Sequence, residues 1–344
     1  MKPCLHPPTR IAIAQLAFIG DMVFATPLLG EISERWPHAA MLVIGRPAAL
    51  EMLEDHPAKP TLLPYDKDRN DRGIVGLCRV GMQLRGFRPD LFIGVSRSVR
   101  TMMLARLSGA AVRSGFCASG RRLAYTHVTP RNDSSVTLPL RPLQLLHPYG
   151  ITPTVRPLHI TIAEKKIREA ARHLLEAGWK REPLIAIAPG AHYATKRWPE
   201  HHVGTLLDLI ARHTDWRVAL YGGPNEYELI ARLLSGRSRV LDRRNIGIRG
   251  LAAELPHASL FIGGDSGPTH LARALGLSVL VLHGPTDPGP VGDGRPYHAL
   301  SLQLPCQPCS TSGDPECPLG HHQCLQNLSP ELVFQEASRY LNRH

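Results

Sequence analysis

A stretch rich in small residues, Gly263-Gly-Asp-Ser-Gly-Pro-Thr-His270, has the composition of a loop that binds phosphate. It follows a short apolar run and precedes a helical pattern. Its open backbone amides would therefore lie at a helix N-terminus, where the helix dipole favours an anion. The hydroxyls of Ser266 and Thr269 could add hydrogen bonds. The alternative is an ordinary strand-to-helix turn capped by Asp265 or Ser266, but the stretch contains more glycine than a cap requires.

Two common nucleotide-binding loops do not fit this sequence. The stretch 263–270 lacks the Gly-Lys-Ser/Thr of a P-loop. The chain also lacks a Gly-x-Gly-x-x-Gly followed by an acidic residue ~20 positions later, which argues against an NAD site. We therefore expect the stretch to bind a diphosphate of another kind of ligand.

Positive charge for such a diphosphate is available in the stretch 189–199. Gly190 begins a turn that exposes N–H groups, and Lys196 and Arg197 follow it, although a Lys-Arg pair is also common on a solvated surface. In the stretch 222–226, Glu226 stands at the start of a helix. It could accept hydrogen bonds from a ribose or serve as an ordinary first-turn acid.

Asp21 is the candidate general base. It comes soon after the apolar run 11–16, so its carboxylate would lie beyond the end of a strand and beside a helix N-terminus. From its position alone, a role in capping that helix is slightly favoured. The sequence leaves both roles open.

The elements that must position these loops alternate between strands and helices. Short apolar runs predict strands at 11–16, 40–44, 89–95, 111–116, 184–188, 217–221, 260–262 and 279–282. Helical spacing predicts helices at 23–36, 97–107, 162–177, 199–213, 226–234, 251–258, 271–275 and 330–342. This alternation implies parallel sheets covered by helices, which bind ligands beyond the carboxyl ends of their strands. Prolines between 134 and 157 suit a linker, so we expect domains at 1–155 and 156–328 and a terminal helical segment at 329–344.

The composition agrees with two globular domains and an anionic partner. The chain has 344 residues, which suggests two domains at roughly 100–200 residues each. Its formal charge is +11, with 40 Lys and Arg against 29 Asp and Glu. That excess suits a phosphorylated substrate, an acidic membrane surface or nucleic acid. No apolar run approaches the length of a membrane-spanning helix and no signal peptide is recognised, so we expect a cytoplasmic protein.

Four of the seven cysteines, Cys306, Cys309, Cys317 and Cys324, lie close together near the end of the chain. A secreted disulfide framework would spread them more evenly, which favours a reducing compartment. The pair Cys306-x₂-Cys309 is a good chelating half-site, and four thiolates could hold a structural Zn²⁺ or Fe ion. The spacing of the other two cysteines is not a standard one. Free or packed thiols and disulfides therefore remain alternatives.

Taken together, five stretches resemble one family, the ADP-heptose:lipopolysaccharide heptosyltransferases of glycosyltransferase family 9. They are Ile19-Gly-Asp-Met-Val-Phe-Ala-Thr-Pro27, Ala188-Pro-Gly-Ala191 with Thr195-Lys-Arg-Trp-Pro199, Tyr221-Gly-Gly-Pro-Asn-Glu226, Gly263-Gly-Asp-Ser-Gly-Pro-Thr-His-Leu271 and His283-Gly-Pro-Thr-Asp287. Their order and spacing are those of the family. The cysteine-rich tail is also similar to that of members that add the second inner-core heptose.

The resemblance implies a GT-B fold, an α/β architecture with two Rossmann-like domains facing across a cleft. The acceptor would bind largely to the N-terminal domain and the sugar nucleotide to the C-terminal one, and the last helix would return to the N-terminal domain. Asp21 matches the proposed general base, Lys196 the lysine on the donor phosphates, and Glu226 the acid that contacts the ribose. The donor-binding set is completed by Gly190, Thr195, Asp265, Ser266, Gly267 and His270.

The function implied by the resemblance is that of an inverting glycosyltransferase that moves heptose from ADP-heptose to the anionic, lipid-linked lipopolysaccharide core. Alternatives are transfer of heptose or another sugar to a different acceptor such as a protein, a GT-B-like sugar-nucleotide epimerase, and a binding module without turnover. We expect no cofactor requirement for transfer, no nucleic-acid partner, and peripheral contact with the inner face of the cytoplasmic membrane. The candidates for binding the acceptor are Arg97, Arg100, Arg121 and Arg122.

Overall fold

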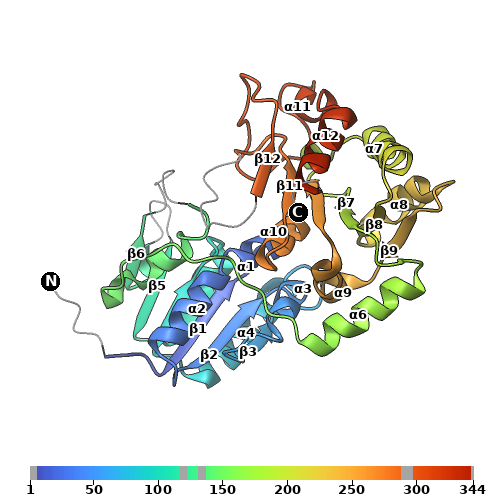
Figure 1. Ribbon diagram of the computed structural model, residues 1–344. Coiled ribbons are helices and arrows are strands. Elements are labelled where there is room, and N and C mark those ends of the chain that lie inside the picture. The colour runs from blue at the N-terminus through green and yellow to red at the C-terminus, as the bar shows by residue number, and fades with distance from the viewer. Residues whose placement is uncertain (1–5, 117–121, 131–136, 288–296, 342–344) are drawn as a thin grey trace. The chain divides into compact units, whose positions relative to one another are not determined.

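Two α/β units make up the part of the chain that the structure describes (Figure 1). The computed structural model describes residues 6–116, 122–130, 137–287 and 297–341. The division between the units falls between Thr161 and Ile162, whereas the sequence pattern placed it between 155 and 156. Within the described residues, no helix has both the length and the apolar character needed to cross a membrane.

The first unit is built on a sheet of parallel strands in the order β3-β2-β1-β4-β5-β6. Residues Ile11 to Ala14 of the central strand β1 are wholly buried, as expected where helices cover both faces of a sheet. The sequence pattern missed the two edge strands, β3 and β6, because they are short and partly exposed. The strands are β1 (Arg10–Gln15), β2 (Ala40–Gly45), β3 (Thr61–Pro64), β4 (Leu91–Gly94), β5 (Val112–Phe116) and β6 (His127–Thr129).

The helix predicted at 23–36 begins at Thr26, as α2 (Thr26–Arg35), and a separate short helix that was not predicted, α1 (Ile19–Val23), precedes it. The cause is Pro27, whose nitrogen carries no hydrogen to donate to the Val23 carbonyl. The hydroxyl of Thr26 donates to that carbonyl instead, at 2.7 Å.

The sequence pattern also missed α4 (Gly73–Phe87), because glycines interrupt its helical spacing. Two of these glycines are required by packing. A Cβ at Gly76 would lie 2.3 Å from the carbonyl oxygen of Asp71, and one at Gly81 would lie 2.7 Å from the Leu107 side chain. The unit is completed by α3 (Pro47–Leu50), α5 (Val99–Leu107) and the 3₁₀ turns η1 (Glu51–Leu53), η2 (Arg122–Ala124) and η3 (Pro142–Tyr149).

The second unit repeats the strand order of the first. Its parallel sheet has the order β12-β11-β10-β7-β8-β9. Counted from the opposite edge, this is the order of the first sheet and that of a Rossmann fold. The prediction of an α/β fold with two Rossmann-like sheets is confirmed. The strands are β7 (Leu184–Ala188), β8 (Arg217–Gly222), β9 (Val240–Arg244), β10 (Leu260–Gly264), β11 (Val279–Leu282) and β12 (Tyr297–Leu300).

The last helix, α12 (Pro330–Leu341), belongs to the second unit. It packs against α7 (Glu200–His213), and Val333 and Ala337 are wholly buried in the core of the second unit. Its apolar side chains are thus covered within the second unit, and a return of this helix to the N-terminal domain stays a prediction. The other helices there are α6 (Glu164–Glu176), α8 (Tyr227–Leu234), α9 (Gly247–Glu254), α10 (Gly267–Ala274) and α11 (Gln323–Gln326), with 3₁₀ turns η4 (Ala194–Lys196), η5 (Pro224–Glu226) and η6 (Leu255–His257).

In each sheet the strand order changes direction between two neighbours, β1 and β4 in the first unit and β7 and β10 in the second. Loops that leave such neighbouring strands at their carboxyl ends diverge and leave room for a ligand. Asp21 and Arg97 follow β1 and β4, and Gly190 and Asp265 follow β7 and β10. The fold thus places four of the predicted site residues at the two positions where ligands are expected.

Candidate active site

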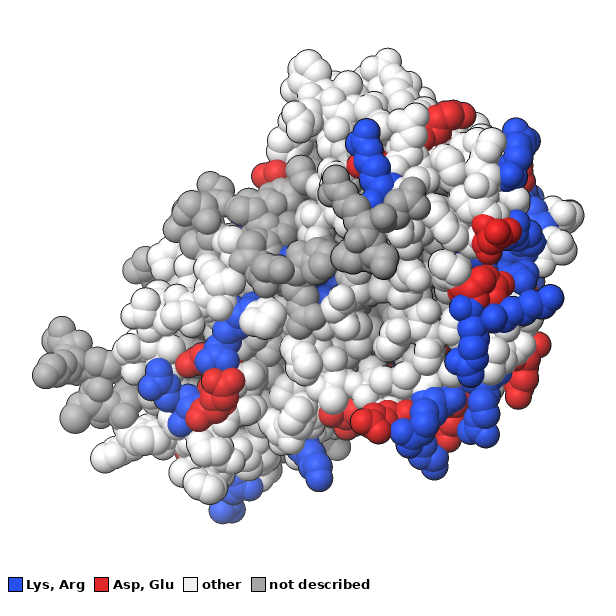
Figure 2. Space-filling model, in the orientation of Figure 1, with Lys and Arg blue, Asp and Glu red and all other residues white. Residues whose placement is uncertain are grey.

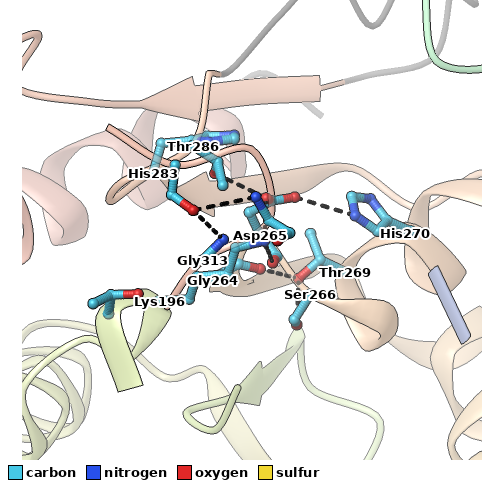
Figure 3. Close-up of polar contacts among 12 residues, drawn as sticks. Lys196, Gly264, Asp265, Ser266, Thr269, His270, His283, Thr286 and Gly313 are labelled. Atoms are coloured by element: carbon cyan, nitrogen blue, oxygen red, sulfur yellow. Dashed lines mark hydrogen bonds and ion pairs between the residues drawn. The ribbon is translucent and has the colours of Figure 1, made fainter. Parts of the chain in front are cut away.

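Asp265 lies at the centre of a polar network beyond the carboxyl end of β10 (Figure 3). Its Oδ2 accepts hydrogen bonds from the Lys196 ammonium at 2.7 Å and from the Thr286 hydroxyl at 2.9 Å. Its Oδ1 lies 3.1 Å from Nε2 of His270. The side chains of Lys196 and Asp265 are 13% and 18% exposed. Three loops that are far apart in the sequence therefore meet on one largely buried carboxylate.

Two opposing effects act on the pKa of Asp265. Burial by itself would raise it, but the hydrogen bond from His270 and the positive charges of His270 and Lys196 outweigh burial and hold the pKa well below its usual range. The carboxylate is therefore ionised at neutral pH. Its charge in turn holds the Lys196 ammonium beside the start of α10.

His283 and Tyr297 extend this network toward β11 and β12. Nε2 of His283 and the Tyr297 hydroxyl form a hydrogen bond, and the Arg273 guanidinium lies 4.9 Å from the centre of the Tyr297 ring. Burial lowers the pKa of His283 to about 4 even though the Asp265 charge acts to raise it, so the ring is neutral at pH 7. Sequence reasoning missed His283 and Thr286 as site residues. The signal that could have found them is their position directly after a predicted strand of the same sheet.

The N-terminus of α10 has the open form predicted for the stretch 263–270. Ser266 is the N-cap residue, with an extended backbone (φ −146°, ψ 169°), and its hydroxyl makes no capping hydrogen bond. Gly267 then begins the helix, so amides of the first turn face away from the helix body. Thr269 differs from the expectation: it is 1% exposed and its hydroxyl donates to the Gly264 carbonyl at 2.6 Å. Its side chain closes the turn and is not presented to a ligand.

Gly190 and Glu226 are brought together at the carboxyl ends of β7 and β8. A Cβ at Gly190 would lie 2.3 Å from Cγ of Glu226, so the glycine leaves the space that the glutamate occupies. Oε2 of Glu226 accepts a hydrogen bond from the Gly223 amide at 2.9 Å, as a first-turn acid would. The structure thus shows a local capping role for this half-buried side chain.

The side chain of Thr195 was expected to bind the donor, but it contacts another part of the protein. It is 3% exposed. Its hydroxyl donates to the Asp314 carbonyl and accepts from the Asp314 amide, both at 2.8 Å. These bonds join the loop of Lys196 to residues 304–328, here called the cysteine segment. The same segment donates from the Cys309 and Ser310 amides to the Pro285 carbonyl at 3.0 and 3.1 Å.

The four cysteines of this segment are free thiols in the structure. Burial raises the pKa of Cys324 to about 11, and backbone amides, foremost that of His322, lower the pKa of Cys317. Among the described residues, no group of three or more His, Cys, Asp or Glu side chains is arranged to hold a metal ion. A structural metal at Cys306, Cys309, Cys317 and Cys324 therefore remains a prediction.

Asp21 lies in the first unit, in the short helix α1. Its side chain is exposed, and Oδ2 accepts a hydrogen bond from the Phe18 amide at 3.1 Å. The Gln15 side chain donates to its backbone carbonyl at 3.2 Å. Within the described residues, Oδ1 accepts no hydrogen bond, so the carboxylate caps its helix with one oxygen and presents the other to solvent.

The predicted acceptor arginines are described only in part. Arg97 and Arg100 are exposed at the start of α5, beyond the carboxyl end of β4. Arg122 lies in the 3₁₀ turn η2. Arg121, like Cys4 and Cys117, lies outside the described residues.

Comparison with known proteins decides the family. The model of glycosyltransferase family 9 (heptosyltransferase) matches residues 77–319, a span that includes Lys196, Glu226 and Asp265. The chain belongs to this family. The match covers the loops of Lys196, Glu226 and Asp265, so these loops are those of a family 9 enzyme.

Individual family 9 relatives match along most of the chain. Lipooligosaccharide heptosyltransferase 2 of Haemophilus ducreyi is 24% identical over 353 residues, which cover 96% of this chain and 99% of the relative. Lipopolysaccharide heptosyltransferase 3 of Escherichia coli is 24% identical over 284 residues, covering 79% and 82%. Relatives named heptosyltransferase 1, 2 and 3 all match at 22–25% identity, which does not single out one type.

Solved structures of the family share the fold. A family 9 glycosyl transferase from Veillonella parvula superposes with a TM-score of 0.84 at 23% identity, covering 99% of both chains. The E. coli ADP-heptose lipopolysaccharide heptosyltransferase II superposes with a TM-score of 0.80 at 18% identity, covering 97% of this chain and 99% of that one. The GT-B architecture of this family 9 chain is therefore shown by comparison as well as by its two sheets.

Proposed function

We propose that this family 9 enzyme transfers heptose from ADP-heptose to a hydroxyl of the lipopolysaccharide inner core, with inversion at the anomeric carbon. The observation that carries the proposal is the network of Lys196, Asp265 and His270. It fixes positive charge beside the open N-terminus of α10, an arrangement that suits a diphosphate. Relatives named for lipopolysaccharide heptosyl transfer support the donor and the acceptor.

In the proposed reaction, the diphosphate of the donor is the leaving group. Negative charge develops on it as the bond to the anomeric carbon breaks, and Lys196 and the first-turn amides of α10 stabilise that charge. Asp265 does not repel the diphosphate strongly, because Lys196, Thr286 and His270 hold its oxygens. Glu226 contacts the ribose in this scheme, and we propose that transfer requires no cofactor.

Asp21 is the proposed base. An acceptor hydroxyl attacks the anomeric carbon from the face opposite the diphosphate while Asp21 removes the hydroxyl proton, and a single displacement inverts the configuration. The exposed oxygen Oδ1 supports this role, since it is open to a substrate while Oδ2 is held by the Phe18 amide.

The acceptor is proposed to be inner-core lipopolysaccharide that already carries one heptose, because the cysteine-rich tail resembles that of second-heptose enzymes. Arg97 and Arg100 would contact its anionic groups, with Arg121 and Arg122 as further candidates. Since this acceptor is lipid-linked, we propose a cytoplasmic enzyme that works at the inner face of the membrane.

A product analysis by mass spectrometry tests the function. Purified protein is incubated with ADP-heptose and lipid-linked core that carries one heptose, and with the same core lacking heptose. The expected result is ADP together with a core that has gained one heptose, formed faster on the heptosylated acceptor. Transfer to a protein alone, use of another sugar donor alone, or an epimerised nucleotide sugar without transfer would each contradict the proposal.

A further inference from the structure

The positive charge of the protein is concentrated in the first unit. Residues 1–161 contain 20 Lys and Arg against 11 Asp and Glu, a net charge of +9, whereas residues 162–344 contain 20 against 18, a net charge of +2. Within the first unit, the stretch 72–132 holds 11 arginines and one acidic residue, Asp90. Its helical elements are α4, α5 and the turn η2.

Exposed apolar side chains lie on the same three elements. Helix α4 packs against α5, and α5 packs against η2, so the three elements are neighbours; their exposed surface is here called the docking face. Its exposed apolar residues are Ile74, Val75 and Met82 of α4, which are 68%, 78% and 70% exposed, Val99 and Met103 of α5, and Leu123 of η2, which is 86% exposed. Exposure of several large apolar side chains together marks an interaction surface.

The charges of the docking face are not neutralised by neighbouring carboxylates. Among the arginines from Arg72 to Arg113, all of which the structure describes, Arg79 is the one with a carboxylate in ion-pair distance, that of Asp71 at 2.6 Å. On the second unit, Lys and Arg alternate with Asp and Glu over α6 and α8 (Figure 2), and pairs such as Arg168 with Glu164 form there. The excess positive charge of the docking face therefore remains available to an anionic partner.

We propose that the docking face binds the surface of an anionic lipid bilayer. Arginines attract the phosphate groups of lipids, while Ile, Val, Met and Leu side chains between them enter the interface. A nucleic acid would match the charge but would leave these exposed apolar side chains in water, whereas the interface of an anionic bilayer accommodates both. The inference does not depend on the transfer reaction, although it would place the enzyme beside a lipid-linked acceptor.

Vesicle sedimentation tests this proposal. The full-length protein is mixed with phosphatidylcholine vesicles and with vesicles containing phosphatidylglycerol, at low and high salt. The apolar variant Ile74→Ser/Val75→Ser/Met82→Ser and the charge variant Arg72→Gln/Arg85→Gln are compared with a control on α6, Lys165→Gln/Arg172→Gln/Leu175→Ser. Circular dichroism checks that each variant is folded, and ADP binding provides a readout that is independent of lipid.

We expect binding to anionic vesicles that weakens with salt. The charge variant should lose about fivefold in affinity per arginine, the apolar variant at least tenfold, and the α6 control almost nothing. Equal binding to neutral vesicles, no binding, or wild-type binding by folded docking-face variants would overturn the proposal. So would a dimer that the apolar variant separates, because the face would then be covered by a second copy.

The cysteine segment supports a second inference, because it holds the loop of Lys196 from several sides. Besides the two bonds between Thr195 and Asp314, Nε2 of His322 donates to the Thr195 carbonyl at 2.9 Å. The stem of Lys196 passes so close to Gly313 that a Cβ there would lie 3.0 Å from Cε of the lysine. Lys196 therefore lies between Asp265 at its ammonium and the cysteine segment along its stem.

We infer that Thr195 and His322 are positioning residues that hold Lys196 through the cysteine segment. This inference rests on the proposed role of Lys196 at the diphosphate. The cysteine segment would then have a role that requires no metal and no disulfide. Its backbone packs along the stem of Lys196 and keeps the ammonium beside α10. Thr195 acts through its hydroxyl, which both donates and accepts, so serine can replace it and valine cannot.

Paired substitutions at Thr195 test this inference. Thr195→Val should lower kcat about tenfold and weaken ADP binding, Thr195→Ser should restore both, and His322→Leu should act like the valine variant. Glu316→Gln, an exposed change in the same segment, serves as the control. As a readout independent of activity, acylation of Lys196 by an amine-reactive reagent, measured by mass spectrometry, should be faster in Thr195→Val.

The readouts separate failure of the inference from failure of the proposed function. If Thr195→Val lowers thermal stability but leaves kcat, ADP affinity and Lys196 acylation unchanged, the role is structural and the inference is wrong. If wild-type protein transfers no heptose, the proposed function fails, while the acylation rates still report whether the segment holds Lys196.

Discussion

The two units have the same strand order but place different groups beyond the carboxyl ends of their strands. The second unit surrounds a buried carboxylate, Asp265, with Lys196, His270 and Thr286. The first unit presents an exposed carboxylate, Asp21, together with exposed arginines. One backbone topology therefore supports two chemical environments: a preorganised, partly dry site suited to a charged leaving group, and an open, basic surface suited to a large anionic substrate. The difference lies in loop side chains, because the central strands β1, β4, β7 and β10 are largely apolar in both units.

The largest effect is expected from Asp21, because the proposed mechanism assigns proton transfer to the first unit alone. Asp21→Asn should lower kcat by about 10²–10⁴ because general-base catalysis contributes that much. ADP affinity, measured by calorimetry, should not change, since the donor groups lie in the second unit. A variant that retains wild-type turnover would remove Asp21 as the base, and one that loses ADP binding would break the division of labour between the units.

The next largest effect is expected from Lys196. Lys196→Met should lower kcat/KM by about 10²–10³, the loss typical of removing one group that stabilises developing charge. ADP binding should weaken as well, in contrast to Asp21→Asn. Lys196→Arg keeps the positive charge and should recover part of the activity. Unchanged ADP affinity in Lys196→Met would contradict the assignment of this lysine to the diphosphate.

Two substitutions in the second unit test whether its buried ion pair contributes more to stability than an exposed one. Glu254 is 2% exposed and pairs with Arg243, which is 13% exposed. Glu254→Ala should lower the free energy of unfolding by about 3–5 kcal/mol because it leaves the Arg243 charge buried without its partner. Urea denaturation measures this loss. The matched control is Glu200→Ala, which removes the exposed pair with Arg232 and should change stability little.

The smallest effect concerns the pH dependence of stability. The folded protein keeps His283 neutral, with a pKa lowered to about 4 from an ordinary value of 6.5. The unfolded chain binds a proton on this ring between those values and the folded protein does not, so stability present above pH 6.5 is lost as the pH falls toward 4. The contribution is about 3 kcal/mol in total. Urea denaturation from pH 7.5 to 4.5 should show a shallower loss for His283→Asn, and an identical slope would contradict the assignment.

Much of the fold could be predicted from the sequence, because buried parallel strands are continuous apolar runs. The runs at 11–16 and 184–188 became the central strands β1 and β7. The misses have local causes. Helix α4 was hidden by glycines that its packing against Asp71 and Leu107 requires, and Pro27 separates α1 from α2, so the helix expected from residue 23 begins at Thr26.

The candidate site was predicted in part. Lys196, Asp265 and His270 were identified from their loops, and the structure brings them together. Thr195 and Thr269 were expected to face a ligand, but both hydroxyls are directed to backbone atoms. A sequence names a hydroxyl without its direction, because that depends on which carbonyl lies nearest after folding. His283 and Thr286 were missed although they directly follow a predicted strand, because the approach of this loop to Asp265 depends on how β11 pairs with β10.

The sequence alone determined the class of fold, the residue types of the donor loops and the family resemblance, since these depend on local spacing and composition. The tertiary structure decided which residues share one carboxylate, that the last helix packs within the second unit, and that the cysteine segment lies against Lys196. It also made neighbours of α4, α5 and η2, which carry exposed apolar residues. These properties depend on contacts between residues that are distant in the chain, and only the folded packing brings such residues together.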